Sequence, residues 1–172
     1  PGHTRPQGIF CRLAVKECQP WERSRGASGL CCKIGKRRQA KKMKKEKGEI
    51  YCLIGDGEAN EGTIWESALL GGSLKLDNLT CIMDFNKSGE RAIKLNSCTN
   101  KFRSFNWHSL FIDGHNEEEI EKAIRFKNDL PKFIELKTVK GKGCPIMENN
   151  PEWHHKVPSS EQFAEALKEL SL

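Results

Sequence analysis

Four short runs of apolar residues alternate along the chain with stretches whose apolar residues recur at helical spacing. The apolar runs cover residues 49–54, 79–85, 107–112 and 131–139, and each has the length and composition of a buried β-strand. Helical spacing is found over 60–76, near 99–105, over 116–128 and over 159–170. This alternation predicts an α/β fold, in which helices flank a mainly parallel sheet.

Several elements carry more specific signals. The run "EIYCLI" at 49–54 has no polar alternation, so we expect a strand buried on both faces. Gly71 and Gly72 are expected to weaken the end of the helix over 60–76, because glycine has low helix propensity. Asn116 precedes three glutamates and is a suitable N-cap for the next amphipathic helix.

Positive charge is concentrated in residues 33–47, "KIGKRRQAKKMKKEK". This segment holds nine of the 29 lysines and arginines but only one of the 23 acidic residues, so the rest of the chain is close to neutral. A basic run can bind nucleic acid, but no aromatic residues for base stacking interleave this one. We therefore favour a solvated surface helix and do not expect nucleic acid as a partner.

The eight cysteines do not form a metal-binding or disulfide pattern. Cys52 and Cys81 lie inside apolar runs, Cys31 and Cys32 are adjacent, and no CxxC pair occurs. We expect reduced thiols and a cytoplasmic protein. We also expect no membrane-spanning helix and no secretory leader, because no long apolar run and no basic-then-apolar start occur in the sequence.

Polar residues follow the first two strands at their carboxyl ends, where ligands bind in parallel α/β sheets. Asp56 lies in "GDGEANEG" and Asn86 lies in "DFNKSG". If the two strands are neighbours, a carboxylate and an amide oxygen converge there. Together with a backbone carbonyl and phosphate oxygens, they would suit a hard cation such as Mg²⁺, or alternatively Ca²⁺ or Mn²⁺. Gly55 and Gly57 would let the backbone approach the phosphate closely.

Two other ligand-binding loops do not fit these residues. An EF-hand loop fails because its sixth position is Glu61 rather than glycine, and "KGKG" at 140–143 lacks the spacing of a Walker loop. Two ordinary polar loops that cap strands are the remaining alternative.

The "GDG" and the later asparagine resemble the thiamine-diphosphate motif, and the similarity extends further. "IGDGEANEGTIWESALLGGSLKLDNLTCIMDFNKS", "FNWHSLFIDGHNEEEIEKAI", "PKFIELKTVKGKG" and "MENNPEWHH" resemble the transketolase family, specifically the N-terminal subunit of split transketolases. We therefore expect one domain over residues 1–172, with 49–172 well matched and 1–48 divergent.

The resemblance implies a set of residues that bind thiamine diphosphate and its divalent metal. Asp56 and Asn86 resemble the metal's side-chain ligands, and Ser88 would offer its backbone carbonyl. The other residues that it implies for cofactor binding are Gly57, Glu58, Asn86, His154, His3 and Gly26.

The resemblance also implies residues for catalysis and subunit contact. His154 and His3 match histidines near the reacting part of the cofactor, where a histidine can transfer protons at neutral pH. Glu61 and Glu66 match acidic residues that link two cofactor sites across a dimer interface. His108 and His115 match positions that we interpret as structural.

Two departures from the family bear on activity. The glycine loop reads "SRGASGLC", in which Arg25 and Ala27 are foreign, and two family histidine positions are missing from the first 48 residues. In the family another domain holds the aminopyrimidine; we do not expect residues after 139 to form it, so the chain alone is expected to be inactive.

The resemblance therefore implies a partner, a C-terminal subunit that carries the pyrimidine-binding domain. Together the two would transfer a two-carbon ketol unit between phosphorylated sugars. The alternative is a degenerate, non-catalytic relative.

The helix over 60–76 also suggests assembly. Trp65 and Leu69 are four residues apart and share one helical face, close to Glu61 and Glu66. We expect this face at a subunit interface, in a homodimer or in a heterotetramer with the C-terminal subunit. In the alternative, Trp65 packs into the core of its own chain.

Overall fold

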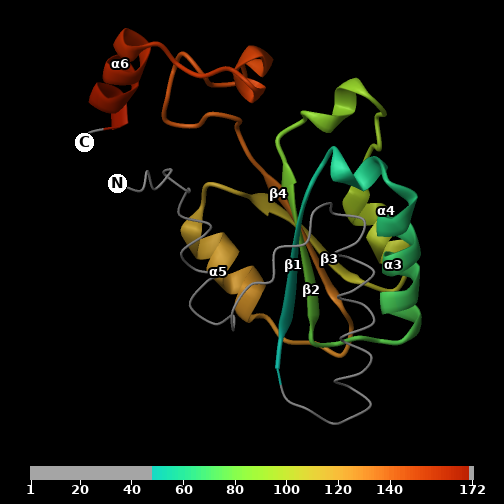
Figure 1. The fold of residues 1–172 in the computed structure, drawn as a ribbon. Helices are drawn as coiled ribbons and strands as arrows, with labels where there is room; N and C mark the ends of the chain where they lie inside the picture. The colour runs from blue at the N-terminus through green and yellow to red at the C-terminus, as the bar shows by residue number, and fades with distance from the viewer. Residues whose placement is uncertain (1–47, 171–172) are drawn as a thin grey trace.

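A computed structural model describes residues 48–170 of the chain, and these residues form a four-stranded, all-parallel sheet. The order across the sheet is β1-β2-β4-β3 (Figure 1). The strands are β1 (Ile50–Gly55), β2 (Leu79–Phe85), β3 (His108–Asp113) and β4 (Lys132–Lys137). The predicted α/β class and all four predicted strands are confirmed.

Four helices connect or follow these strands, and they confirm the predicted helices. They are α3 (Gly62–Ser73), α4 (Cys98–Ser104), α5 (Glu117–Arg125) and α6 (Ser160–Leu170). Three single turns of 3₁₀-helix lie in the loops: η1 (Glu58–Asn60), η2 (Gly89–Arg91) and η3 (Pro151–His154). Asn116 caps α5 as predicted, because its Oδ1 accepts the N–H groups of Glu118 and Glu119. None of the described helices has the length and apolar character to cross a membrane.

The main core lies between the sheet and the pair α3 and α4, which cover one face (Figure 1). Phe102 of α4 stacks on Phe133 of β4 at a ring-centroid distance of 3.8 Å and meets Trp107 edge-on at 5.1 Å. The indole N–H of Trp107 donates to the carbonyl of Ala68 in α3 at 2.7 Å, so the one polar atom of this ring is satisfied inside the core.

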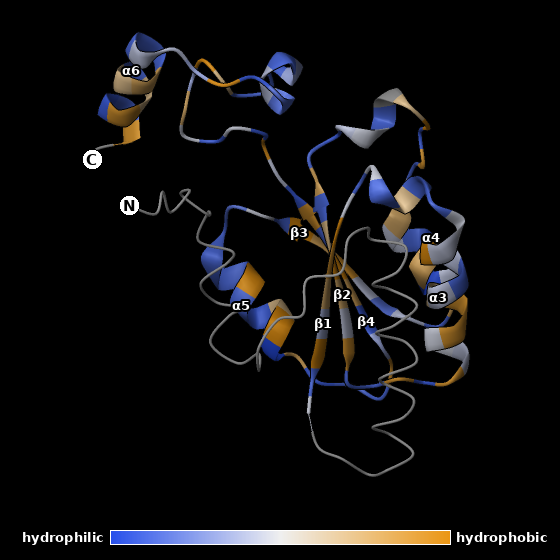
Figure 2. Cartoon of the chain, viewed as in Figure 1, coloured by the Kyte–Doolittle hydropathy of each residue, from blue (hydrophilic) through white to orange (hydrophobic). Residues whose placement is uncertain are grey.

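Helix α5 covers the opposite face and forms a smaller core. Ile120 and Ala123 of α5 pack against Ile82, Ile134 and Leu136 of the two central strands. Figure 2 shows the strands as mainly hydrophobic, whereas α5 carries alternating hydrophobic and hydrophilic bands. This banding is expected of a helix with one face on the sheet and the other in solvent.

Strand β1 differs from its prediction, because only one of its faces is fully buried. Cys52 and Ile54 lie in the main core, but Leu53 on the other face is 48% exposed. The reason is position: β1 ends the described sheet, and α5 covers the central strands instead.

Helix α3 continues through Gly71 and Gly72 and ends at Ser73, directly after them and before the predicted residue 76. A Cβ atom at Gly72 would lie 1.6 Å from the carbonyl oxygen of Phe105, and one at Gly71 would lie 2.7 Å from the Trp107 ring. The two glycines therefore allow α3 to pack closely on the segment that leads into β3, and this tertiary gain outweighs their low helix propensity.

The four cysteines of the described segment are reduced and buried: Cys52, Cys81, Cys98 and Cys144. They behave as small apolar side chains within the fold.

Candidate functional site

The loops after β1 and β2 meet at the carboxyl edge of the sheet. The two strands are paired in parallel, with Gly55 opposite Asp84, and the N–H of Asp56 donates to the carbonyl of Asp84 at 3.1 Å. A Cβ atom at Gly89 would lie 2.6 Å from the backbone nitrogen of Gly57. Only glycine allows this contact between the two backbones, and it brings the Asp56 and Asn86 loops together as the sequence predicted.

Asp56 has an unusual environment for a carboxylate. The residue is 7% exposed, and its Oδ2 atom is buried without a hydrogen-bond partner. A buried carboxylate oxygen with no partner is unfavourable, because it has lost water and gained nothing in exchange. A bound cation would supply the missing interaction.

The other atoms nearby determine which cation fits. The described residues contain no cluster of three or more His, Cys, Asp and Glu side chains that could hold a metal. A site at Asp56 would therefore combine one carboxylate with amide, carbonyl and ligand oxygens, which is the donor set of a hard cation rather than of zinc.

Asn86 is held in one orientation. Its Nδ2 donates to Oδ2 of Asp84 at 3.0 Å, and its Oδ1 accepts the N–H of Ser88 at 3.0 Å. An amide oxygen has two lone pairs, so Oδ1 retains one for a cation. The turn at Asn86 also fixes the backbone of Ser88.

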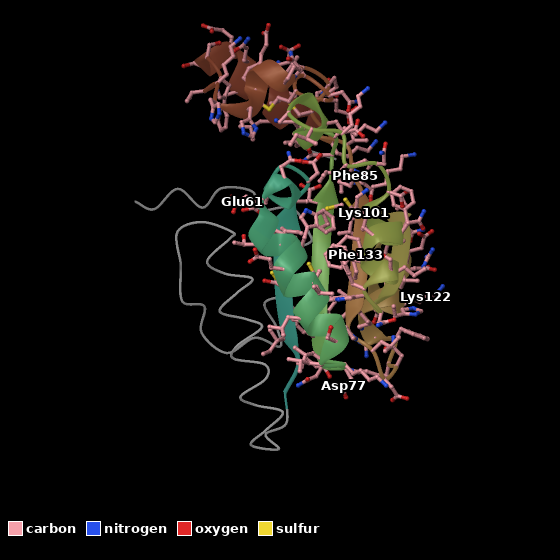
Figure 3. All side chains as sticks on the ribbon, turned by 90° about the vertical axis from the view of Figure 1, so that its right-hand side faces the viewer. Glu61, Asp77, Phe85, Lys101, Lys122 and Phe133 are labelled. Atoms are coloured by element: carbon pink, nitrogen blue, oxygen red, sulfur yellow. The ribbon has the colours of Figure 1, made fainter. Side chains whose placement is uncertain are left out.

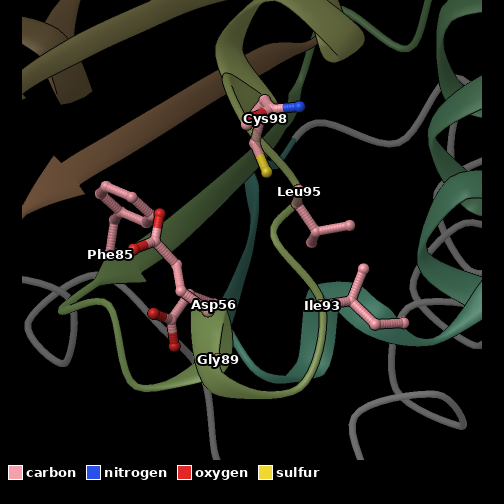
Figure 4. A pocket seen from close by; sticks show the side chains of 8 residues that line it. Asp56, Phe85, Gly89, Ile93, Leu95 and Cys98 are labelled. Atoms are coloured by element: carbon pink, nitrogen blue, oxygen red, sulfur yellow. The ribbon is translucent and has the colours of Figure 1, made fainter.

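A small pocket opens beside Asp56 (Figure 4). Besides Asp56, its lining has two polar residues, Glu90 and Asn96, and otherwise consists of Phe85, Gly89, Ile93, Leu95 and Cys98. Burial raises the pKa of the Cys98 thiol to about 11, and the nearby Glu135 carboxylate acts in the same direction. Cys98 is therefore a neutral wall of the pocket at neutral pH, not a thiolate nucleophile.

Two local hydrogen bonds fix the loop between β1 and α3. Oε2 of Glu58 accepts the N–H of Gly55 at 2.8 Å, so this carboxylate folds back over the loop. The indole N–H of Trp65 donates to the carbonyl of Ala59 at 2.9 Å. Glu61 and Glu66 are exposed, and Glu61 lies at the end of α3 nearest the carboxyl edge, as the labels of Figure 3 show.

His154 lies in η3, beyond the carboxyl edge, and does not line the pocket around Asp56. It is exposed, and its Nδ1 lies 2.7 Å from Nζ of Lys140. The Lys140 ammonium and the adjacent His155 ring lower the pKa of His154, because each opposes a second positive charge. His154 is thus a neutral acceptor next to a cationic side chain.

The sequence predicted structural roles for two other histidines, His115 and His108, and both make contacts within the fold. Nε2 of His115 accepts the N–H of Val139 at 2.8 Å, which ties the loop after β3 to the loop after β4. His108 stacks on Phe126 at 4.7 Å between ring centroids. His3 and Gly26 lie outside the described residues.

Four residues at the same edge were not anticipated: Asp84, Gly89, Thr138 and Lys140. Each depends on a contact that is distant in the sequence, such as the hydrogen bond from Thr138 Oγ1 to Asp84 Oδ1. For Lys140 a signal did exist, since "KGKG" follows β4 at the edge that holds Asp56.

Comparison with known proteins agrees with this architecture. Residues 33–171 match the family described as "Transketolase, thiamine diphosphate binding domain". The solved structure of transketolase from Campylobacter jejuni superposes with a TM-score of 0.76 at 29% identity, over 86% of this chain and 25% of that one.

Two bacterial proteins named as transketolase subunits are also similar. One, from the apulose-4-phosphate transketolase of Phocaeicola vulgatus, is 40% identical over 140 residues, which cover 77% of this chain and 50% of that protein. The other, the 6-deoxy-6-sulfo-D-fructose transketolase subunit SqwG of a Clostridium species, is 37% identical over 129 residues, covering 70% and 47%. The chain thus spans about half the length of these two relatives.

The fold and the paired loops define a thiamine-diphosphate-binding domain of the α/β class. The chain belongs to the transketolase family, and its matched residues are those of the family's N-terminal domain.

Proposed function

We propose that the chain holds the diphosphate of thiamine diphosphate through a divalent cation, Mg²⁺ by preference, at the carboxyl edge of β1 and β2. The observation that carries this proposal is the buried, unpartnered Oδ2 of Asp56, in a loop that meets the loop carrying the oriented amide of Asn86. Asp56, Asn86 and the carbonyl of Ser88 would hold the cation, and the exposed backbone of Gly57 would face the diphosphate. Mn²⁺ and Ca²⁺ are expected to substitute for Mg²⁺.

The chain would supply positive charge from a second strand end as well. Lys140 follows β4 at the same edge, and its ammonium is adjacent to His154. The ammonium of Lys140 can bind a phosphate oxygen. The neutral imidazole of His154 can accept a proton from a hydroxyl. This pair supports a role for His154 near the substrate and adds Lys140 to it.

We further propose that a separate subunit completes the enzyme. Relatives of similar sequence are named as transketolase subunits, which supports a divided enzyme. The bound cofactor would supply a thiazolium that stabilises a carbanion, and the partner would hold its aminopyrimidine. The complex would transfer a two-carbon ketol unit between phosphorylated sugars, and Glu61 and Glu66 would lie near the contact between cofactor sites.

The second candidate is a non-catalytic relative that binds the cofactor but does not turn over. The foreign residues Arg25 and Ala27 in "SRGASGLC" favour it. Both candidates share the cation site, so the same experiment tests the common step.

Isothermal titration calorimetry tests the cation site directly. The full chain should bind thiamine diphosphate in the presence of Mg²⁺ and lose most of this affinity with EDTA. Asp56→Ala should remove the Mg²⁺ dependence, because the substitution deletes the only side-chain charge assigned to the cation. Asp77→Ala is a matched control, since it removes an exposed aspartate at the opposite end of the sheet from the proposed site (Figure 3). Binding that Asp56→Ala leaves unchanged would contradict the proposal.

A further inference from the structure

Asp84 joins three neighbouring strand ends. Its backbone carbonyl accepts the N–H of Asp56 at 3.1 Å, which connects β2 to the loop after β1. Its carboxylate accepts Nδ2 of Asn86 through one oxygen and the hydroxyl of Thr138 through the other. Thr138 is itself fixed, because its N–H donates to the carbonyl of Phe85 at 3.2 Å. The cation site and the end of β4 are therefore parts of one hydrogen-bonded network.

This network determines which end of the Asn86 amide faces the site. The two ends of an amide are similar in shape, but only the oxygen can bind a cation. An ionised carboxylate can only accept hydrogen bonds, so Asp84 selects the NH₂ end of Asn86. Oδ1 is left on the side of Ser88, whose N–H it accepts. Without Asp84, the amide would keep the hydrogen bond from the N–H of Ser88 but lose the one that its NH₂ group donates, so its oxygen would be held less firmly toward the cation.

We propose that Asp84, held in place by Thr138, is a positioning residue that fixes the amide oxygen of Asn86 toward the cation. The inference rests on the proposed cation site, which it deepens. Groups that orient a metal ligand from behind commonly change metal affinity by about 10- to 100-fold when they are removed.

The first test is calorimetry of Mg²⁺-dependent thiamine-diphosphate binding by the full chain. Asp84→Ala should weaken binding by roughly 10- to 100-fold. Thr138→Val should cause a smaller loss, since Asp84 then loses one of its two side-chain donors. Asp77→Ala is a matched control, because it removes an exposed aspartate at the opposite end of the sheet (Figure 3).

A charge exchange separates positioning from general structural support. Asn86→Asp alone would place two carboxylates side by side, so it should weaken cation-dependent binding. Adding Asp84→Asn exchanges the two groups: the introduced amide at position 84 can donate to the introduced carboxylate at position 86. The second oxygen of that carboxylate remains free for the cation. The double variant should therefore bind at least about ten-fold tighter than Asn86→Asp, a rescue within the range expected for groups that orient a metal ligand. A residue that only supported the fold would give no such rescue.

The outcomes separate this inference from the proposed function. If the wild type binds and Asp56→Ala does not, then unchanged affinity in Asp84→Ala overturns the positioning role alone. Absence of rescue in the double variant also overturns the positioning role. If Asp84→Ala fails to fold, the double variant alone decides the question. If the wild type shows no Mg²⁺-dependent binding, the proposed function and the positioning role both fail.

Discussion

His108 shows how one side chain couples the fold to pH. It stacks on Phe126 and is half-buried, and burial lowers its pKa below the usual value, aided by the charges of Lys132 and Arg103. In the unfolded chain the histidine titrates near about 6.5. The unfolded state therefore binds more protons than the folded state as the pH falls through this range.

We predict that the free energy of unfolding decreases as the pH falls from about 7.5 to about 5.5, across the unfolded pKa of histidine and toward the lower folded value. His108→Gln should reduce the slope of this dependence, because the introduced amide does not titrate. Urea unfolding at several pH values measures both. An identical slope in wild type and variant would show that His108 does not contribute.

Individual residues also mark the limit of what the sequence could predict. Asp56 and Asn86 could be identified because each follows an apolar run, a pattern visible in the sequence. Asp84 could not, because its role depends on Thr138, which lies 54 residues further on, just after a different strand. The candidate cation ligands were thus predictable from local pattern, whereas the groups proposed to orient them require the sheet order.

At the scale of elements, the same distinction holds for α3. Hydrophobic spacing predicted the helix, but the two glycines near its end were interpreted by propensity alone. Their contacts with Phe105 and Trp107 arise only when α3 lies on the segment before β3. The exposed face of β1 was missed for a similar reason, because burial of a strand depends on which helices cover it.

Gly72 and Gly62 form a matched pair for testing this packing. A Cβ at Gly72 would clash with the backbone of Phe105, whereas a Cβ at Gly62 meets nothing within 4 Å. We predict that Gly72→Ala destabilises the fold by about 1–3 kcal/mol or more, as overpacking does. Gly62→Ala should be neutral or stabilising by up to about 1 kcal/mol, because alanine favours the helix. Thermal unfolding of both variants measures the difference, and equal effects would contradict the packing argument.

At the scale of the whole molecule, the outer surface of α3 bears on assembly. Trp65 is half-buried: its ring packs on Phe102 at 5.6 Å between centroids, and its indole N–H donates to the carbonyl of Ala59. It therefore packs partly into the core of its own chain, the alternative to an interface position. Leu69 and Leu70 remain 53% and 44% exposed, next to exposed Glu66. Two adjacent exposed leucines, on the helix whose N-terminal end reaches the candidate cofactor edge, are consistent with a subunit contact.

We predict that the chain forms a homodimer or a complex with a pyrimidine-binding subunit through this surface. Leu69→Glu should weaken the assembly, since it would place a charge against an apolar partner, yet leave the fold intact because the side chain is exposed. Val157→Glu is a suitable control, as Val157 is 84% exposed in the segment before α6. Light scattering across a dilution series, with and without the partner, measures the change. If wild type and Leu69→Glu remain equally monomeric without the partner and bind it equally well, the contact lies elsewhere, and Leu69 and Leu70 are isolated apolar residues of an ordinary surface.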